Sequence, residues 1–216
     1  MEIMAYLVCL ILTWVSVAFS GGIWGDVTWL LAVLSLIAVP MVVVRRLWRA
    51  DEVASGIVIS WSLRDALTGL ATVLALFVPV ALCNHWVRTE IQDLTFHFAW
   101  SNVANVDILS ALATQILCVA FPEEFFYRGF LQTAFLRRFR GMKRISRWAS
   151  ALAIVAASSC FALAHLPSGG VFRLLTFFPG LLFGFLRYRT NGLLGAILCH
   201  AGCNTMMMIL NVHYWG

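Results

Sequence analysis

Long apolar runs alternate with short polar segments along almost the whole chain. A helix needs about 20 apolar residues to cross roughly 30 Å of hydrocarbon. Seven runs approach this length: about 4–20, 27–44, 65–87, 107–127, 148–165, 171–187 and 192–213. The pattern predicts an all-α protein, a polytopic transmembrane helix bundle of about seven spans, within a range of six to eight. We find no internal repeat and no room for a soluble domain, so we expect residues 1–216 to form a single integral-membrane domain.

Composition agrees with a membrane protein. Of the 216 residues, 62% are hydrophobic and 12% are charged, and the mean hydropathy of +0.89 lies outside the usual range of soluble domains. The six cysteines lie in apolar runs without CxxC spacing, so we expect packing residues rather than a disulfide framework. The first run carries Glu2 and no Lys or Arg before it, so we expect a retained span rather than a signal peptide.

The basic residues indicate an orientation. The net charge is +5, but the Lys and Arg residues concentrate between the apolar runs, for example at 45–49 and 137–147, rather than along one stripe. We therefore expect no nucleic acid partner. With the N-terminus in the cytoplasm, thirteen of the fifteen Lys and Arg residues fall on the cytoplasmic side, and Arg88 and Arg173 fall outside. We expect a multi-pass protein of the plasma or inner membrane with a cytoplasmic N-terminus.

Three polar groups interrupt the apolar runs near the C-terminal half. They are Glu123 and Glu124 with Arg128, then His165, and then His200 with Asn204. An acid at the centre of a bilayer costs about 2.5 to 3.5 kcal/mol on insertion scales, so residues of this kind in a span indicate a functional site. We expect the helices that carry the chemistry within about 107–213.

The acidic pair divides into two roles. Glu124 and Arg128 are four residues apart on a helix and share a face, which favours an ion pair that offsets the cost of burying both charges. Glu123 lies about 100° around the helix and has no partner close in sequence, so it is the better candidate for a general base. The alternative is a buried charge network that only fixes the helix bundle.

The histidines and the asparagine have competing interpretations. His165 ends an apolar run just before Pro167, where a break in the helix admits water, although a single His at a helix end is more often a cap. His200 and Asn204 share a helix face and can both donate into one pocket, or they can serve interhelical packing. Cys199 and Cys203 make a His/Cys metal site conceivable, but their spacing to other ligands does not support it.

In this order, EExxxR, FxxxH and HxxxN resemble the intramembrane endopeptidases of the CAAX-processing and bacteriocin-protection (CPBP) family, which includes the glutamic-type, type II CAAX prenyl endopeptidase. The motifs read Glu123-Glu124-Phe125-Phe126-Tyr127-Arg128, Phe161-Ala162-Leu163-Ala164-His165 and His200-Ala201-Gly202-Cys203-Asn204. The resemblance covers the segment from about Phe121 to Asn211, and the first hundred residues match only in general character.

The resemblance implies a role for each residue. Glu123 matches the catalytic glutamate, and His165 matches the histidine that helps it to position and deprotonate water. His200 and Asn204 match the pair proposed to stabilise the oxyanion, and Glu124 with Arg128 would support the site. Hydrolysis of a peptide bond requires such a base and such donors.

A metal mechanism is the alternative within the same family. Two histidines and a glutamate resemble a three-ligand zinc site, in which Glu123, His165 and His200 would be the ligands. Asparagine is a poor zinc ligand and a good oxyanion donor, so we expect no cofactor. The expected partners are the lipid bilayer and a membrane-anchored protein or peptide substrate that is cut near its anchor.

Two other classes of function fit the same residues. The polar groups can serve as an interhelical network in a non-catalytic immunity or scaffold protein of the membrane. Glu123 can also serve as the proton carrier of a proton-coupled transporter. The substitution Glu123→Gln separates the three, because it abolishes proteolysis in an enzyme, changes nothing in a scaffold and uncouples proton flux in a transporter.

Overall fold

The computed structural model describes residues 2–19, 21–45, 62–99, 103 and 107–215. Its α-helices are α1 (Glu2–Ala18), α2 (Gly22–Val43), α3 (Leu63–Trp86), α5 (Ile108–Thr114), α6 (Phe121–Glu124), α7 (Gln132–Arg140), α8 (Ala149–Ala164), α9 (Phe177–Thr190) and α10 (Leu194–Asn211). Wider π-helical turns are η2 (Val87–Ile91), η3 (Gln115–Ala120) and η4 (Phe125–Leu131), and tighter 3₁₀ turns are η5 (Ser146–Trp148), η6 (Leu166–Ser168) and η7 (Gly170–Thr176). Positions 46–49 of the expected basic segment lie outside the described residues.

The all-α prediction is confirmed. Within the described residues, six helical stretches are long and apolar enough to cross a membrane: Ile23–Val43, Leu63–Ile91, Ile108–Arg140, Ser146–Ala164, Gly170–Thr190 and Leu194–Asn211. The remaining expected span, α1, is apolar but has only 17 residues, at the lower end of what crosses hydrocarbon. The protein is therefore an integral membrane protein.

One helix is longer than the sequence pattern predicts. The expected span at 107–127 begins as predicted, because the Asp107 side chain accepts a hydrogen bond of 3.0 Å from the amide of Ser110 and caps the helix. The helix then continues without interruption to Arg140. The basic residues of its last turn, Arg137, Arg138 and Arg140, interact favourably with the negative end of the helix dipole, so they extend the helix instead of ending it.

The chain breaks after α8, as Pro167 predicts. The turn passes through Gly170, whose positive φ of 65° lies in the left-handed region that glycine tolerates. The next stretch starts in 3₁₀ conformation, and the α-helix itself begins only at Phe177, later than the expected residue 171. It ends at Asn191, which caps it in the left-handed conformation at φ 57°.

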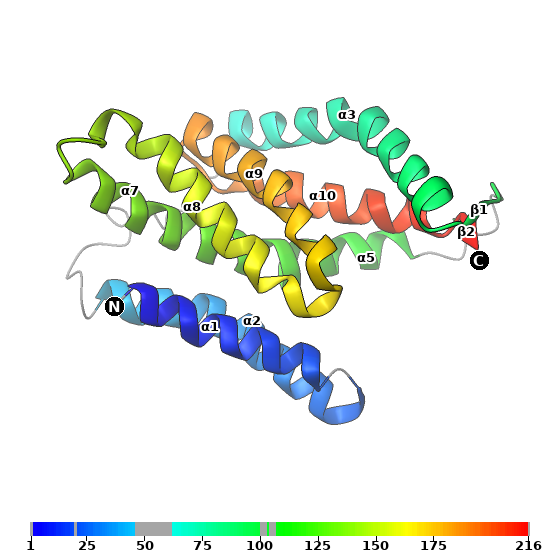
Figure 1. The fold of residues 1–216 in the computed structure, drawn as a ribbon, viewed down its shortest axis with the longest axis horizontal. Coiled ribbons are helices and arrows are strands. Elements are labelled where there is room, and N and C mark those ends of the chain that lie inside the picture. The colour runs from blue at the N-terminus through cyan, green and yellow to red at the C-terminus, as the bar shows by residue number, and fades with distance from the viewer. Residues whose placement is uncertain (1, 20, 46–61, 100–102, 104–106, 216) are drawn as a thin grey trace.

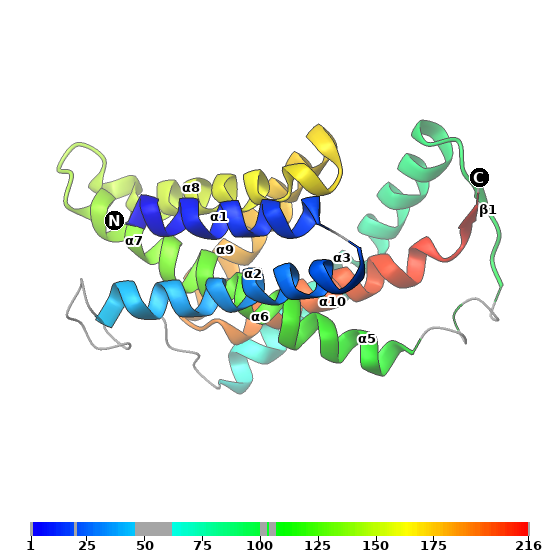
Figure 2. The same cartoon turned by 90° about the horizontal axis from the view of Figure 1, so that it is seen from below.

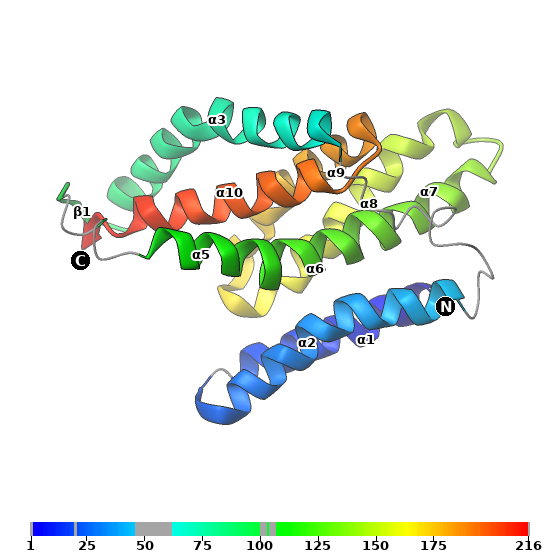
Figure 3. The same cartoon turned by 180° about the vertical axis from the view of Figure 1, so that it is seen from behind.

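The helices surround one long element, the continuous α5–α7 helix. Figures 1 and 3 show α10 between this helix and α3, with α8 and α9 covering another side. The α1–α2 hairpin packs along the opposite flank, where α2 contacts α6 and η4. Figure 2 shows the N-terminus at the same end of the molecule as the turn between α7 and α8.

The C-terminus lies at the opposite end of the molecule (Figures 1 and 2). Here a short antiparallel pair of strands, β1 (Thr95–Phe96) and β2 (Tyr214–Trp215), aligns Thr95 with Trp215. This pair brings the segment after α3 next to the last residues of the chain.

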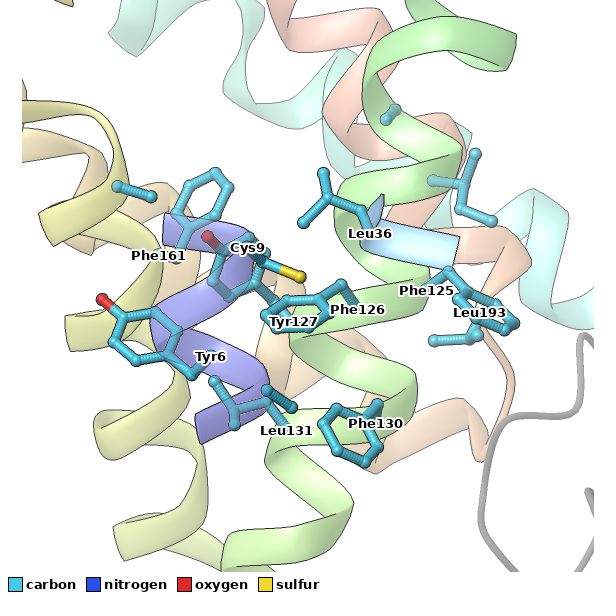
Figure 4. Packing of buried hydrophobic residues seen from close by; sticks show 14 of the residues in the cluster. Tyr6, Cys9, Leu36, Phe125, Phe126, Tyr127, Phe130, Leu131, Phe161 and Leu193 are labelled. Carbon is cyan, nitrogen blue, oxygen red and sulfur yellow. The ribbon is translucent and has the colours of Figure 1, made fainter. Parts of the chain in front are cut away.

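The core fills the space between the α1–α2 hairpin and η4. Figure 4 shows Phe126, Tyr127 and Phe130 of η4 packed with Tyr6 of α1 and Phe161 of α8. Edge-to-face contacts between rings hold the helix in place. The ring centroids are 5.0 Å apart for Phe126 and Tyr127 and 5.2 Å apart for Tyr127 and Phe161. This packing fixes the turn that carries the two glutamates.

Candidate active site

Glu124 and Arg128 form the ion pair that their spacing predicts. The side chains are 0% and 1% exposed, and Arg128 Nη1 lies 3.0 Å from Glu124 Oε1. The guanidinium also donates through Nη2 to the carbonyl oxygen of Gly180 at 3.3 Å and lies 4.4 Å from the ring centroid of Phe161. Arg128 thus connects the α5–α7 helix to α8 and α9.

His200 joins the same network from α10. Its Nδ1 lies 2.8 Å from Glu124 Oε1, and because a carboxylate only accepts hydrogen bonds, the proton of this contact is on Nδ1. The Phe183 ring stacks on the imidazole, with 4.8 Å between the ring centroids, and fixes the plane of the imidazole. The other nitrogen, Nε2, lies 3.8 Å from Glu123 Oε2, a separation too long for a hydrogen bond.

Glu123 keeps a carboxylate oxygen without a hydrogen bond. The Glu123 side chain is 20% exposed, while that of its neighbour Glu124 is fully buried. In the described part of the chain, Glu123 Oε2 is buried and accepts no hydrogen bond. Glu124 Oε1 thus has two cationic or donor partners, Arg128 and His200, whereas Glu124 Oε2 and Glu123 Oε2 accept no hydrogen bond among the described residues.

His165 lines the same small cavity as Glu123. It is the last residue before the break after α8, and its Nδ1 contacts the carbonyl oxygen of Phe161 at 2.8 Å. A carbonyl oxygen only accepts, so Nδ1 carries the proton and Nε2 is left as an acceptor. Glu123 and His165 both line one cavity of about 180 Å³, which equals the volume of about six water molecules at about 30 Å³ each.

Asn204 lies one turn after His200 and has a partner that we did not expect from the sequence. Its Nδ2 donates to Gln115 Oε1 at 2.9 Å, across the contact between α10 and η3. Gln115 is a polar residue in an apolar span, two turns before Glu123 on the same helix. This polar position was the sequence signal that would have identified Gln115 as part of the site. A primary amide has two N–H groups, so one of those on Asn204 stays available.

The structure brings the expected residues together only in part. Glu123 and His165 share the cavity, whereas His200 and Asn204 do not belong to its lining. His200 approaches Glu123 from the α10 side and is the link between the two groups. Other lining residues that the sequence did not reveal come from the first two helices, among them Thr13, Ser16 and Trp29.

The residues of the zinc alternative do not fit a metal ion in this arrangement. Glu123, His165 and His200 would have to converge on one point. Over residues 2–19, 21–45, 62–99, 103 and 107–215, no group of three or more His, Cys, Asp or Glu side chains is arranged to hold a metal.

Comparison with known proteins adds one finding. Residues 105–206 match the family described as Type II CAAX prenyl endopeptidase Rce1-like. No curated protein and no solved structure matches the chain. The matched segment contains the acidic pair, both histidines and Asn204, and it leaves the α1–α2 hairpin and α3 outside.

Proposed function

The chain belongs, through residues 105–206, to the Rce1-like type II CAAX prenyl endopeptidase (CPBP) family and is a protease, and from this premise we propose that Glu123 and His165 activate water for peptide hydrolysis inside the membrane. One observation carries the proposal. The two side chains come from helices that are separate in sequence and line one cavity, and the Glu123 side chain keeps 20% of its surface exposed there.

Glu123 is the general base in this proposal. A water molecule between Glu123 and His165 loses a proton to the Glu123 carboxylate as its own oxygen bonds to the scissile carbonyl carbon. His165 orients the water through Nε2, since its Nδ1 proton is held by the Phe161 carbonyl. The proton then passes to the amide nitrogen as the C–N bond breaks, which yields a new carboxyl group and an amine.

In this proposal His200 and Asn204, which lie on α10 outside the cavity lining, stabilise the oxyanion when the scissile carbonyl oxygen points toward α10. Asn204 donates through the N–H that Gln115 does not use. His200 Nε2 lies 3.8 Å from Glu123 Oε2 and donates to the oxyanion when that nitrogen carries a proton. Glu124 and Arg128 are supports that hold the histidine and the helix.

The substrate is a membrane-anchored protein or peptide, cut at a peptide bond near its anchor. A site on helices that span a membrane reaches bonds close to the bilayer, and the matched family is described by its prenyl endopeptidase activity. We place the chain in the plasma or inner membrane, and the distribution of Lys and Arg supports an orientation with the N-terminus in the cytoplasm.

The test compares new peptide termini by mass spectrometry in membranes of cells that express the chain, its Glu123→Gln variant or its Glu90→Gln variant. Glu90 is exposed and lies in η2, away from the cavity, so Glu90→Gln is the matched control. We expect termini that appear with the unmodified chain and the control but not with Glu123→Gln. Identical profiles at equal protein levels would refute proteolysis by Glu123, and altered proton flux without new termini would support a transporter.

A further inference from the structure

The first two helices supply half of the wall around Glu123 and His165. Of the lining residues, Thr13, Ser16 and Val17 come from α1, and Trp29, Ala32, Val33 and Leu36 come from α2. The family match begins only at residue 105, so this part of the cavity is not covered by it. Glu123 and His165 therefore belong to the half of the lining that the family match covers. The other half comes from α1 and α2, which lie outside the match.

The α1–α2 half of the cavity wall is mainly apolar and includes two hydroxyl oxygens that act as hydrogen-bond acceptors. Thr13 Oγ1 donates to the Cys9 carbonyl at 2.9 Å, and Ser16 Oγ donates to the Thr13 carbonyl at 2.7 Å. Because both hydroxyl protons are used inside α1, the two oxygens offer only lone pairs to the cavity. The rest of the α1–α2 side consists of apolar side chains, including Val33 and Leu36, and of Trp29, whose indole carries one N–H donor.

The hairpin is fixed in position relative to the catalytic helices. Tyr6 of α1 donates to the Cys160 carbonyl of α8 at 3.0 Å, five residues before His165. Cys9 contacts the Ser35 carbonyl at 3.6 Å, which joins α1 to α2. Leu36 is 6% exposed and belongs to the core cluster shown in Figure 4. A wall held in this way has a defined shape and can select by size.

We propose that this half of the wall selects the substrate, with Val33 as a specificity-determining residue that limits the size of the side chain next to the scissile bond. The inference rests on the proposed function and specifies its substrate as a peptide with one small apolar side chain in the cavity. The volume of about 180 Å³ is below the 300 to 1,000 Å³ that is common for ligand pockets, so it accepts one side chain and the attacking water rather than a long lipid chain.

The test uses three variants of the purified full chain and a peptide series that varies only the residue next to the cut site, from Gly through Ala and Val to Phe. Val33→Phe fills the cavity, and Val33→Ala enlarges it. Leu34→Phe is the matched control, because Leu34 is the next residue on α2, is 50% exposed and does not line the cavity. Unfolding temperatures show whether each variant is folded.

We expect opposite shifts in preference from the two Val33 variants. Val33→Phe should lower kcat/KM for the Val and Phe peptides by about tenfold or more and spare the Gly peptide, because one extra group in an apolar pocket changes selectivity by about 10- to 200-fold. Val33→Ala should raise the rate for the Phe peptide, and Leu34→Phe should match the unmodified chain. An unchanged preference in folded Val33→Ala and Val33→Phe overturns the inference, while cleavage by the unmodified chain still supports the proposed function. If the unmodified chain cuts no peptide, both proposals fail.

Discussion

Arg128 is the residue on which the buried charges depend. It is 1% exposed and pairs with Glu124, which also contacts His200. The arginine therefore compensates a carboxylate that has no access to water. The same side chain reaches the Gly180 carbonyl and the Phe161 ring, so its loss affects three helices.

Replacing Arg128 should destabilise the protein strongly. Arg128→Met leaves Glu124 as an uncompensated buried charge, a change that typically costs about 3 to 5 kcal/mol. The measurement is thermal unfolding in detergent. The double variant Glu124→Gln with Arg128→Met should recover part of the loss because it removes the stranded charge, and an unfolding temperature unchanged by Arg128→Met alone would contradict the role.

Gln115 should affect turnover through Asn204. In Gln115→Leu the Asn204 amide loses the acceptor that orients it, so we expect kcat to fall by about tenfold with little change in KM, a fraction of the 10²- to 10³-fold loss typical of removing an oxyanion donor. Gln115→Glu keeps an acceptor at this position and should retain more of the activity. Steady-state kinetics check this, and equal kcat values for the two variants would argue against orientation by hydrogen bonding.

The contact between α3 and α10 depends on glycine. A Cβ atom on Gly195 would collide with the backbone oxygen and side chain of Asp65, and one on Gly69 would collide with the backbone of Gly195. Neither α3 nor α10 can move closer than this pair permits. The approach aligns α10, and with it His200 and Asn204, beside the central helix.

Gly195→Ala should therefore destabilise the helix pair. Overpacking of this kind costs about 1 to 3 kcal/mol, and the collision involves backbone atoms that cannot rotate away. Gly21→Ala is the control, because a Cβ there meets no atom within 4 Å. Unfolding temperatures of the two variants measure the difference, and an equal effect of both substitutions would exclude a close helix contact at Gly195.

The presence of the helices was easier to predict from the sequence than their lengths or the contacts between them. Apolar runs identified the spans because they are local features, whereas the cap at Asp107 is a finding of the structure. The predicted span ended near residue 127, whereas the helix continues to Arg140, because the basic residues there are compatible with a helix C-terminus. For the candidate site, Glu123 and His165 followed from local motifs. The contact of Gln115 with Asn204 and the cavity wall from α1 and α2 depend on packing between distant segments, which local patterns do not contain.

The strand pair constrains how the whole chain crosses the membrane. Because β1 pairs with β2, residues 95–96 and 214–215 lie on one side, and an even number of spans separates them. Four of the candidate spans lie between these strands, which satisfies this condition. The turn between α7 and α8 lies at the opposite end of the molecule, with the N-terminus (Figure 2).

Topology is thus testable with single cysteines. Lys143→Cys, in the basic turn after α7, should resist a membrane-impermeant maleimide applied to intact cells, and Gln92→Cys, just before β1, should react. Both positions are exposed, and each variant is compared with the unmodified chain to subtract the native thiols. Labelling of Lys143→Cys but not Gln92→Cys would reverse the proposed orientation.

The most direct measurement of the central claim is the turnover number of the purified chain and its Glu123→Gln variant on one peptide identified from the terminus comparison. Loss of a general base typically lowers the rate by 10²- to 10⁴-fold, so we expect a decrease in this range with an unchanged unfolding temperature. Glu90→Gln should turn over at the rate of the unmodified chain. A folded Glu123→Gln variant that retains a rate within threefold of the unmodified chain would contradict the assignment of Glu123 as the base.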